Sequence, residues 1–442
     1  MSLVVGQHRD VAVRQLRPRL DLGHSSTLAP PRLPGKSPHR EQDVPAAVRA
    51  HGVRDIQVPM TESSGAAAQD VADQSDQNPA VPEVPEPAPS DETASDETPV
   101  AFDPPERIFV GGYTEEMGGS ATGLTAYDGA PDDGVPAQLA ALGLGSPSYV
   151  IKHPDEPWLF VVHERTPGQV SAVRYDDNGL HLINTVASDG DGGCHLAFDH
   201  SGNFVVVAHY TSGSIASFKI EDNGALSERI GLLEFEGSGP DPERQDAAHA
   251  HQVVSVGQAL LVPDLGTDSV HLVLIDDEGN LSPAGDSIAL PAGSGPRHLV
   301  LSGQHLVVAC ELSATLWVSA LDAEVGAEGV TVPASTKQTD ERIYPSGIAV
   351  LGDQVVVANR GADTVSVFTL DASGTPHPLV EIDCGGRWPR DVAVDGEQLW
   401  IANQESNNVT VIRPARVSNK PEDWQTVLQL PTPSPACVVP TR

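Results

Sequence analysis

The chain has 442 residues, with 26 Lys and Arg against 61 Asp and Glu, and a formal net charge of −35. This excess of acid opposes binding to nucleic acids or anionic membranes, because both surfaces are negative and require a basic face. We therefore expect no nucleic-acid or membrane partner, and no stretch of the sequence is apolar enough to span a bilayer.

The first hundred residues differ in composition from the rest of the chain. No Phe, Trp or Tyr occurs before Phe102, and residues 60–105 hold 11 acidic and no basic side chains among many Pro, Ala and Ser. Without large apolar side chains such a segment has little from which to build a core. The composition predicts a disordered, low-complexity region over 1–105, followed by a folded domain over 106–442.

The start of the chain does not resemble a secretion signal. Polar residues from Gln7 to Asp10 interrupt the apolar residues at once, and the four cysteines lie far apart without CxxC spacing. We expect a cytoplasmic, reduced protein. The unremarkable sequence that follows Met60 raises the alternative that residues 1–59 are an over-extended translation start.

Beyond residue 106, one pattern recurs six times. Each copy combines a turn element, a short alternating apolar strand, a break with Gly or Asp, a Val-rich strand and another alternating strand. The anchor residue, which opens each copy, is in turn Pro147, Gly193, Ala250, Pro296, Pro345 and Pro389. The intervals of 46, 57, 46, 49 and 44 residues, with alternation of period two, indicate four-stranded propeller blades.

The two ends of this region complete the count. SPACVVP supplies a seventh first strand at Pro435, and RIFVGGY over 107–113 resembles a second strand that has no first strand before it. Pairing the two would close a ring and remove exposed sheet edges. The sequence predicts an all-β, seven-bladed propeller closed by its N- and C-terminal strands. It does not specify an oligomeric state, and a monomer is compatible with it.

Two repeat positions place polar side chains at one end of this ring. The residue after each anchor is Ser148, Cys194, His251, Arg297, Ser346, Arg390 and Ala436. The last residue of each second strand is Tyr113, Glu164, Tyr210, Leu265, Glu311, Arg360 and Gln404. Because neighbouring strands of a blade are antiparallel, both positions lie on the rim of one central mouth.

Three of these residues are arginines, Arg297, Arg360 and Arg390. Crowded positive charge at a narrow mouth is unfavourable in the empty protein, so it indicates a site for carboxylate or phosphate. Arg390 has an alternative, because the adjacent Asp391 could form a structural ion pair with it.

His249 and His251 form an H-x-H pair, whose spacing on a strand permits metal binding. Neither cysteine nor a clear carboxylate set completes a ligand shell, although His195, His209 and His298 are further candidates, so we expect no metal and no cofactor. His163, Asp264, Asn359 and Asn403 share the penultimate position of the second strand, where we expect structural bonds to turn backbone.

Segments such as AHAHQVVSVGQALLVPDLGTDSV, GPRHLVLSGQHLVVACELSATLWV and VVVANRGADTVSVF resemble the seven-bladed lactonase family, which includes bacterial 6-phosphogluconolactonase and fungal carboxy-cis,cis-muconate cyclase. The resemblance runs over about 108–440. It implies catalytic roles for His251, Glu311, Arg297 and Arg360. One departure is Cys310, which stands where the family has an Asn before the Glu.

The resemblance implies a hydrolase acting on a small anionic lactone, of the 6-phosphogluconolactonase type, in carbohydrate metabolism. Glu311 would be the general base, His251 the acid or water-orienting group, and Arg297 and Arg360 the oxyanion and anion binders. We expect the substrate also to contact Arg390, Glu164, His249, Tyr210 and Gln404. The alternatives are a muconate-type lactonising cycloisomerase, a non-catalytic protein-binding propeller and a metal-dependent gluconolactonase-like enzyme.

Overall fold

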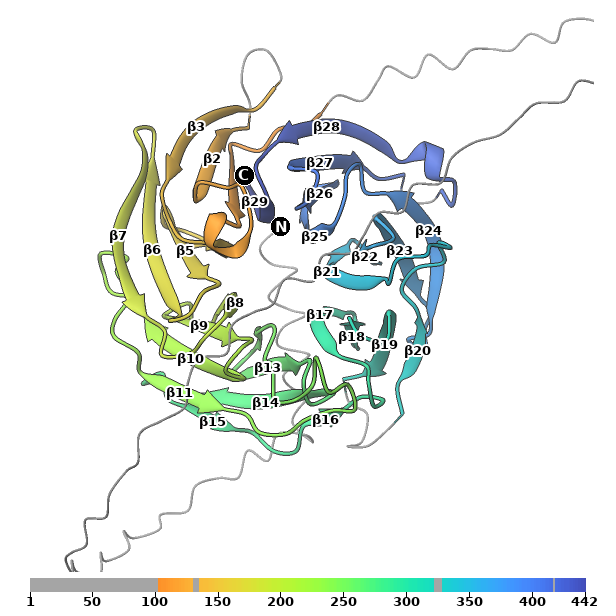
Figure 1. Cartoon of the computed structure of the whole chain (residues 1–442), viewed down its shortest axis with the longest axis horizontal. Coiled ribbons are helices and arrows are strands. Elements are labelled where there is room, and N and C mark those ends of the chain that lie inside the picture. Colours follow the sequence, from red (N-terminus) through yellow and green to blue (C-terminus); the bar gives the residue numbers. More distant parts are fainter. Residues whose placement is uncertain (1–101, 130–134, 322–327, 416–417) are drawn as a thin grey trace, which may run out of the picture. The chain divides into compact units, whose positions relative to one another are not determined.

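The computed structural model describes residues 102–129, 135–321, 328–415 and 418–442. Over these residues, 29 strands form seven antiparallel sheets arranged as the blades of a ring (Figure 1). The predicted seven-bladed, all-β propeller is confirmed. The disorder predicted for 1–105 and the alternative start at Met60 fall almost wholly outside the described residues.

The blade that joins the two ends consists of β29 (Pro435–Thr441), β1 (Arg107–Gly112), β2 (Leu124–Asp128) and β3 (Ala137–Leu142). The next contains β4 (Pro147–Lys152), β5 (Trp158–His163), β6 (Gln169–Asp176) and β7 (Gly179–Ala187). The third contains β8 (Gly193–Phe198), β9 (Phe204–His209), β10 (Ser214–Lys219) and β11 (Gly231–Glu234). The fourth contains β12 (Val254–Val256), β13 (Ala259–Asp264), β14 (Ser269–Ile275) and β15 (Leu281–Pro283), with β16 (Ile288–Ala289) also paired to β14.

The fifth blade consists of β17 (Pro296–Ser302), β18 (His305–Cys310), β19 (Thr315–Ala320) and β20 (Val330–Pro333). The sixth contains β21 (Tyr344–Leu351), β22 (Gln354–Arg360), β23 (Thr364–Leu370) and β24 (Pro376–Asp383). The seventh contains β25 (Pro389–Asp395), β26 (Gln398–Asn403), β27 (Asn408–Arg413) and β28 (Gln425–Pro431). Figure 1 shows the first strands, such as β17 and β21, near the centre and the fourth, such as β20 and β24, at the periphery.

The described residues include two short 3₁₀ helices, η1 (Glu115–Met117) and η2 (Pro421–Asp423). Neither these nor any other described segment forms a helix with the length and hydrophobicity needed to cross a membrane.

The middle strands of each blade are apolar because adjacent blades cover both of their faces. All six residues of β9, FVVVAH, are buried, as expected for a Val-rich strand inside stacked sheets. Hairpins between first and second strands turn at glycines with left-handed backbone, including Gly303 (φ 59°) and Gly352 (φ 65°). A positive φ at the first central residue is the requirement of a type II′ turn, and glycine meets it without steric cost.

The ring closes through β1, which pairs with β29 on one side and β2 on the other. Phe109 faces Val439 across one pair and Ala126 across the other. Gly111 lies so near the next blade that a Cβ atom would be 2.2 Å from the Pro147 carbonyl oxygen. The predicted pairing of N- and C-terminal strands is therefore confirmed, and the glycine of RIFVGGY accommodates the contact between blades.

The residues that the sequence placed at the penultimate position of the second strands tie neighbouring loops together; Asn403, Asp264 and His163 are the last residues of β26, β13 and β5. Asn403 Nδ2 donates to the Cys384 carbonyl at 3.1 Å, and Asp264 Oδ1 accepts the His249 amide at 2.7 Å. His163 Nδ1 lies 2.7 Å from the Gly145 carbonyl oxygen. The structural role predicted for this repeat position is confirmed.

Each innermost strand contains an irregularity just after its anchor. Pro296 pairs with Cys310 whereas His298 pairs with Ala309, and corresponding register shifts occur in the other blades. One extra residue in a strand is a β-bulge, which redirects side chains. Consecutive residues therefore both reach the central channel, as shown by a small cavity there that is lined by Ser148, Tyr149, Cys194, Arg297, His298, Arg390, Asp391 and Ala436.

Closure through β1 predicts that deleting residues 107–113 unfolds the domain, because β29 then loses its partner and two sheet edges are exposed. Deleting residues 1–100 should leave thermal melting and resistance to limited proteolysis unchanged. A variant lacking 107–113 that still melts cooperatively at the wild-type temperature would contradict this account of closure.

Candidate active site

The catalytic residues expected from the sequence meet at the mouth of the channel. Arg297 follows the first residue of β17, Glu311 follows the last residue of β18, and Arg360 ends β22. Glu311 Oε2 lies 3.1 Å from Arg297 Nε and 2.6 Å from Arg360 Nη2. Antiparallel strands from two adjacent blades thus bring together side chains that are up to 63 residues apart in the sequence.

A fourth residue, Arg244, completes this cluster and was missed by the sequence analysis. It lies between β11 and β12, and its Nη2 donates to Glu311 Oε1 at 2.7 Å and to the Tyr210 hydroxyl at 3.2 Å. The next residue, Gln245, is fully buried and donates to the Leu265 carbonyl, which fixes the loop. The sequence did hold one indication of this loop. The interval between the anchors Gly193 and Ala250 is 57 residues, longer than the others, and the additional residues include Arg244.

Glu311 is buried among three guanidinium groups. Burial by itself would raise the pKa of its carboxyl, but Arg360 and Arg297 outweigh that effect and hold the pKa well below its usual range. The carboxylate is therefore a weak proton acceptor. Its effect is to neutralise arginines that would otherwise repel one another.

Arg297 retains unused hydrogen-bonding capacity. It is only 3% exposed, yet its Nη1 has no hydrogen-bond partner among the described residues, and its Nε approaches Glu311 outside hydrogen-bond geometry. Burial, followed by repulsion from Arg360, lowers its pKa to about 10, so it stays charged at neutral pH. A buried cation with free donors at a channel mouth is suited to an anionic ligand.

His251 shares the repeat position of Arg297 and is 6% exposed, with Nδ1 3.9 Å from Cys194 Sγ. Burial and the charge of Arg297 lower the pKa of His251 well below its usual value. The imidazole is therefore neutral at pH 7 but weakly basic, and an anionic ligand that offsets the charge of Arg297 would raise this pKa and favour proton transfer to His251.

The other residues expected to bind substrate form two smaller groups. Glu164 accepts hydrogen bonds from the Tyr113 hydroxyl at 2.6 Å and from Arg390 Nη2 at 3.2 Å, and the Arg390 guanidinium lies 4.7 Å from the Tyr113 ring centroid. The considered Arg390–Asp391 ion pair is not formed. The actual partner, Glu164, is 226 residues away in the sequence, because closure of the ring brings their blades near each other.

His249 and Tyr210 support the loop that carries Arg244. Their rings stack with centroids 4.5 Å apart, and His249 Nδ1 lies 2.8 Å from the Tyr210 carbonyl oxygen. Gln404 makes no hydrogen bond to the arginines. Its backbone N–H donates to the Trp388 carbonyl at 3.1 Å. The described residues contain no group of three or more His, Cys, Asp or Glu side chains placed to hold a metal ion.

The bulges bring a second layer of side chains into the channel, which the sequence analysis did not predict. His298 has its ring centroid 5.2 Å from that of His251 and 5.4 Å from that of His195, and Tyr149 lies 4.0 Å from His195. Burial lowers the pKa of His195 to about 3 and that of His298 well below its usual value. The signal in the sequence was the pair of polar residues after an anchor, as in PRH and PRD.

Asp391 belongs to this deeper layer. Its Oδ2 accepts the Val438 amide at 3.3 Å, and burial raises the pKa of its carboxyl to about 6. Because no cation pairs with it among the described residues, Asp391 is costly to ionise where it stands.

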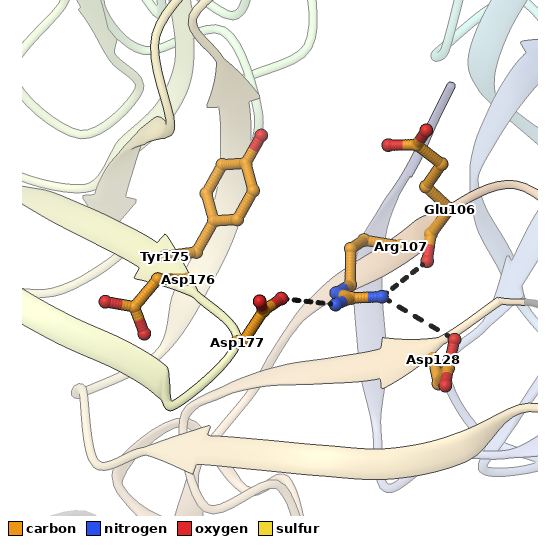
Figure 2. Close-up of a pocket in the computed structure, with 6 residues that line it drawn as sticks. All are labelled: Glu106, Arg107, Asp128, Tyr175, Asp176 and Asp177. Atoms are coloured by element: carbon orange, nitrogen blue, oxygen red, sulfur yellow. Dashed lines mark hydrogen bonds and ion pairs between the residues drawn. The ribbon is translucent and has the colours of Figure 1, made fainter.

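Another pocket, of about 420 Å³, lies at the opposite ends of the strands (Figure 2). It is lined by Glu106, Arg107, Asp128, Tyr175, Asp176 and Asp177. Arg107 is already paired with Asp177 at 3.2 Å and Asp128 at 3.6 Å. Its mainly acidic lining repels anions, so the arginine-rich mouth is the better candidate for an anionic substrate.

Comparisons with known proteins agree with the fold. The family model for the seven-bladed β-propeller lactonase matches residues 107–440. A 6-phosphogluconolactonase from Formosa agariphila is 30% identical over 325 residues, covering 69% of this chain and 92% of the relative. A 6-phosphogluconolactonase from Bacillus subtilis is 28% identical, with 69% and 89% covered. The solved periplasmic gluconolactonase of Pseudomonas aeruginosa is 27% identical, with a TM-score of 0.67 over 75% of this chain and 98% of that one. The chain belongs to the seven-bladed β-propeller lactonase family.

Asp391 predicts a specific pH dependence of stability. The unfolded chain releases this proton near the ordinary pKa of 3.8, whereas the folded chain retains it to about pH 6. Between these values the folded state binds the extra proton, so the free energy of unfolding decreases as pH rises. Asp391→Asn should therefore stabilise the protein by about 2–3 kcal/mol at pH 7.5 and have little effect at pH 4. Urea denaturation at both pH values tests this, and equal effects at the two would contradict it.

Proposed function

We propose that this member of the lactonase family hydrolyses a small anionic sugar lactone to the open acid, as its 6-phosphogluconolactonase relatives are named for doing. The observation that carries the proposal is the mouth itself, where Arg244, Arg297 and Arg360 surround Glu311 beside a neutral His251. We assign this activity to a catalytic domain spanning 106–442.

The arginines supply the anion site. Arg297 and Arg360 are nearly buried, so their charges act in a region of low dielectric where they interact strongly with a phosphate or carboxylate. Arg297 also has the free donor that a bound anion or developing oxyanion requires. Arg244, one-third exposed at the rim, is placed to contact the part of the substrate nearest solvent.

Hydrolysis needs a water molecule activated for attack on the lactone carbonyl. As neutral imidazole, His251 can accept the proton as the water oxygen bonds to the carbonyl carbon, and Arg297 can stabilise the resulting oxyanion. When the tetrahedral intermediate collapses, the ring C–O bond breaks and the ring oxygen takes the proton back from His251. Glu311 keeps the arginines in place. The reverse assignment, with Glu311 as base and His251 as acid, is the alternative from sequence, but both carboxylate oxygens of Glu311 are engaged by arginines, which disfavours it.

Two further functions use the same geometry. A muconate-type cycloisomerase would bind carboxylates with these arginines and protonate the substrate, and a non-catalytic propeller would present the rim to another protein. A panel containing 6-phosphogluconolactone, glucono-1,5-lactone and a carboxymuconate, assayed with and without chelator, separates these functions. Hydrolysis of a lactone supports our proposal, turnover of the muconate alone would replace it, and no turnover of any compound would reject both enzymes. Loss of activity with chelator would identify a metal-dependent enzyme.

Replacing His251, the proton acceptor, and replacing Glu311, which neutralises the arginines, should have different consequences. His251→Gln should lower kcat by about 100-fold or more, the usual contribution of general acid–base catalysis, with little change in melting. Glu311→Gln should cost about 3–5 kcal/mol of stability, because it leaves buried arginines uncompensated. Urea denaturation and steady-state kinetics measure the two effects. If Glu311→Gln abolished turnover at wild-type stability, Glu311 would be the base.

The anion site predicts selective effects of substrate charge. Arg297→Ala and Arg360→Ala should weaken transition-state binding of 6-phosphogluconolactone by about 2–5 kcal/mol more than that of neutral glucono-1,5-lactone. Arg390→Ala is the matched control, because Arg390 shares the repeat position of Arg297 but is held by Glu164. Arg390→Ala should lower stability, with a smaller effect on the preference for the charged over the neutral lactone. Equal kcat/KM losses for charged and neutral lactones in the Arg297 and Arg360 variants would contradict an anion site there.

A further inference from the structure

Trp388 occupies a backbone conformation that is unusual for a large side chain. It precedes the anchor Pro389 and has φ 59°. At the same repeat position, other blades with positive φ have only small residues, Ser146 (φ 39°), Gly192 (φ 64°), Gly295 (φ 61°) and Ser434 (φ 36°). L-residues with bulky side chains are strained in this region, and such strain concentrates at functional sites.

The backbone of the blade does not need the indole. The carbonyl of Trp388 accepts the Gln404 amide at 3.1 Å. Ser146 and Gly295 make the corresponding bonds to Glu164 and Glu311, at 3.0 and 2.8 Å, with little or no side chain. The local fold is therefore satisfied by glycine or serine.

The core does not need the indole either. Trp388 is half-buried and belongs to none of the apolar clusters formed by the described residues, unlike Trp400 and Trp424. Neither packing nor backbone geometry therefore accounts for a tryptophan at this position.

The indole instead lies beside the anion-binding residues. The Arg360 guanidinium carbon is 5.6 Å from the Trp388 ring centroid and 5.7 Å from that of Tyr344, and the two rings are 6.0 Å apart at 56°. Tyr344 precedes the anchor Pro345, so both aromatic rings come from one repeat position in adjacent blades. Both residues are half-buried rather than enclosed in the core.

We propose that Trp388 and Tyr344 form a subsite that binds the lactone ring of the substrate while Arg360 binds its anionic group. Aromatic faces contribute large apolar contact area at low conformational cost, and binding sites combine such surfaces with a few polar groups that fix orientation. The inference builds on the proposed function and specifies its substrate class, namely a saturated ring with an apolar C–H face that carries an anion.

The test separates ring binding from the placement of Arg360. Isothermal titration calorimetry compares glucose 6-phosphate, which carries a ring, with inorganic phosphate, which does not, on wild type, Trp388→Gly and Trp388→Phe. Trp388→Gly should weaken glucose 6-phosphate by about tenfold, a typical loss for one aromatic contact, and change phosphate affinity less than about twofold. Trp388→Phe, which keeps a ring, should recover most of the affinity.

Thermal melting of the same variants provides the second readout. Trp388→Gly should melt at or above the wild-type temperature, because glycine relieves the left-handed backbone. Equal weakening of both ligands would show that Trp388 only positions Arg360, and unchanged affinity for both, or no binding by wild type, would also overturn the subsite. If Trp388→Gly melted below the wild-type temperature, Trp388→Phe would decide the question. A wild-type preference of Trp388→Phe for glucose 6-phosphate over inorganic phosphate would support the subsite, and loss of that preference would reject it. Because the ligands are not turned over, failure of the lactonase proposal in the activity panel would leave this result independent.

Discussion

Charge compensation around Glu311 is the interaction on which the mouth depends. Arg297 and Arg360 are almost completely buried and Arg244 is partly so, and without a carboxylate between them their repulsion would have no internal balance. The three cations make Glu311 a permanent anion and engage both of its carboxylate oxygens, which leaves His251 as the proton acceptor without an ion-pair partner. They also leave positive charge in excess at the mouth of a chain whose net charge is −35. An anionic substrate is therefore attracted to the mouth at short range, against the net negative charge of the chain.

The β-bulges convert this mouth into a layered channel. By directing two consecutive residues inward, each places a deeper side chain beneath the one at the rim. The rim layer contains Arg297 and Arg390, whereas the next contains His298 and Asp391. Histidines of the deeper layer are neutral because they are buried below fixed positive charge. The channel thus changes, within a single residue step, from cationic at the rim to neutral histidines and the acidic Asp391, neither of which attracts an anion.

Features that are unfavourable to folding gather at this end of the molecule. Arg297 has a buried donor without a partner, Asp391 is costly to ionise, and Trp388 carries a bulky side chain in a left-handed conformation. The blades follow ordinary rules, with buried alternating strands, glycines in tight turns and polar residues bonded to neighbouring loops. Local violations of such rules are expected where binding and chemistry are selected at the expense of stability. Their concentration at the mouth supports this location for the site independently of the family relationship.

The sequence by itself determined the blades, their number and the closing strand pair, because alternation with period two and a repeat of 44–57 residues are local properties of the chain. It also placed Arg297, Glu311 and Arg360 at one rim, since antiparallel pairing relates their repeat positions directly. Only the tertiary structure brought in Arg244, because the path of an irregular loop follows no period. Only the tertiary structure showed that Arg390 pairs with Glu164 and not with Asp391, because ring closure brings these distant segments into contact. The deeper layer of His195, His298 and Asp391 likewise escaped prediction, because a one-residue bulge reverses the face that strict alternation assigns to a side chain.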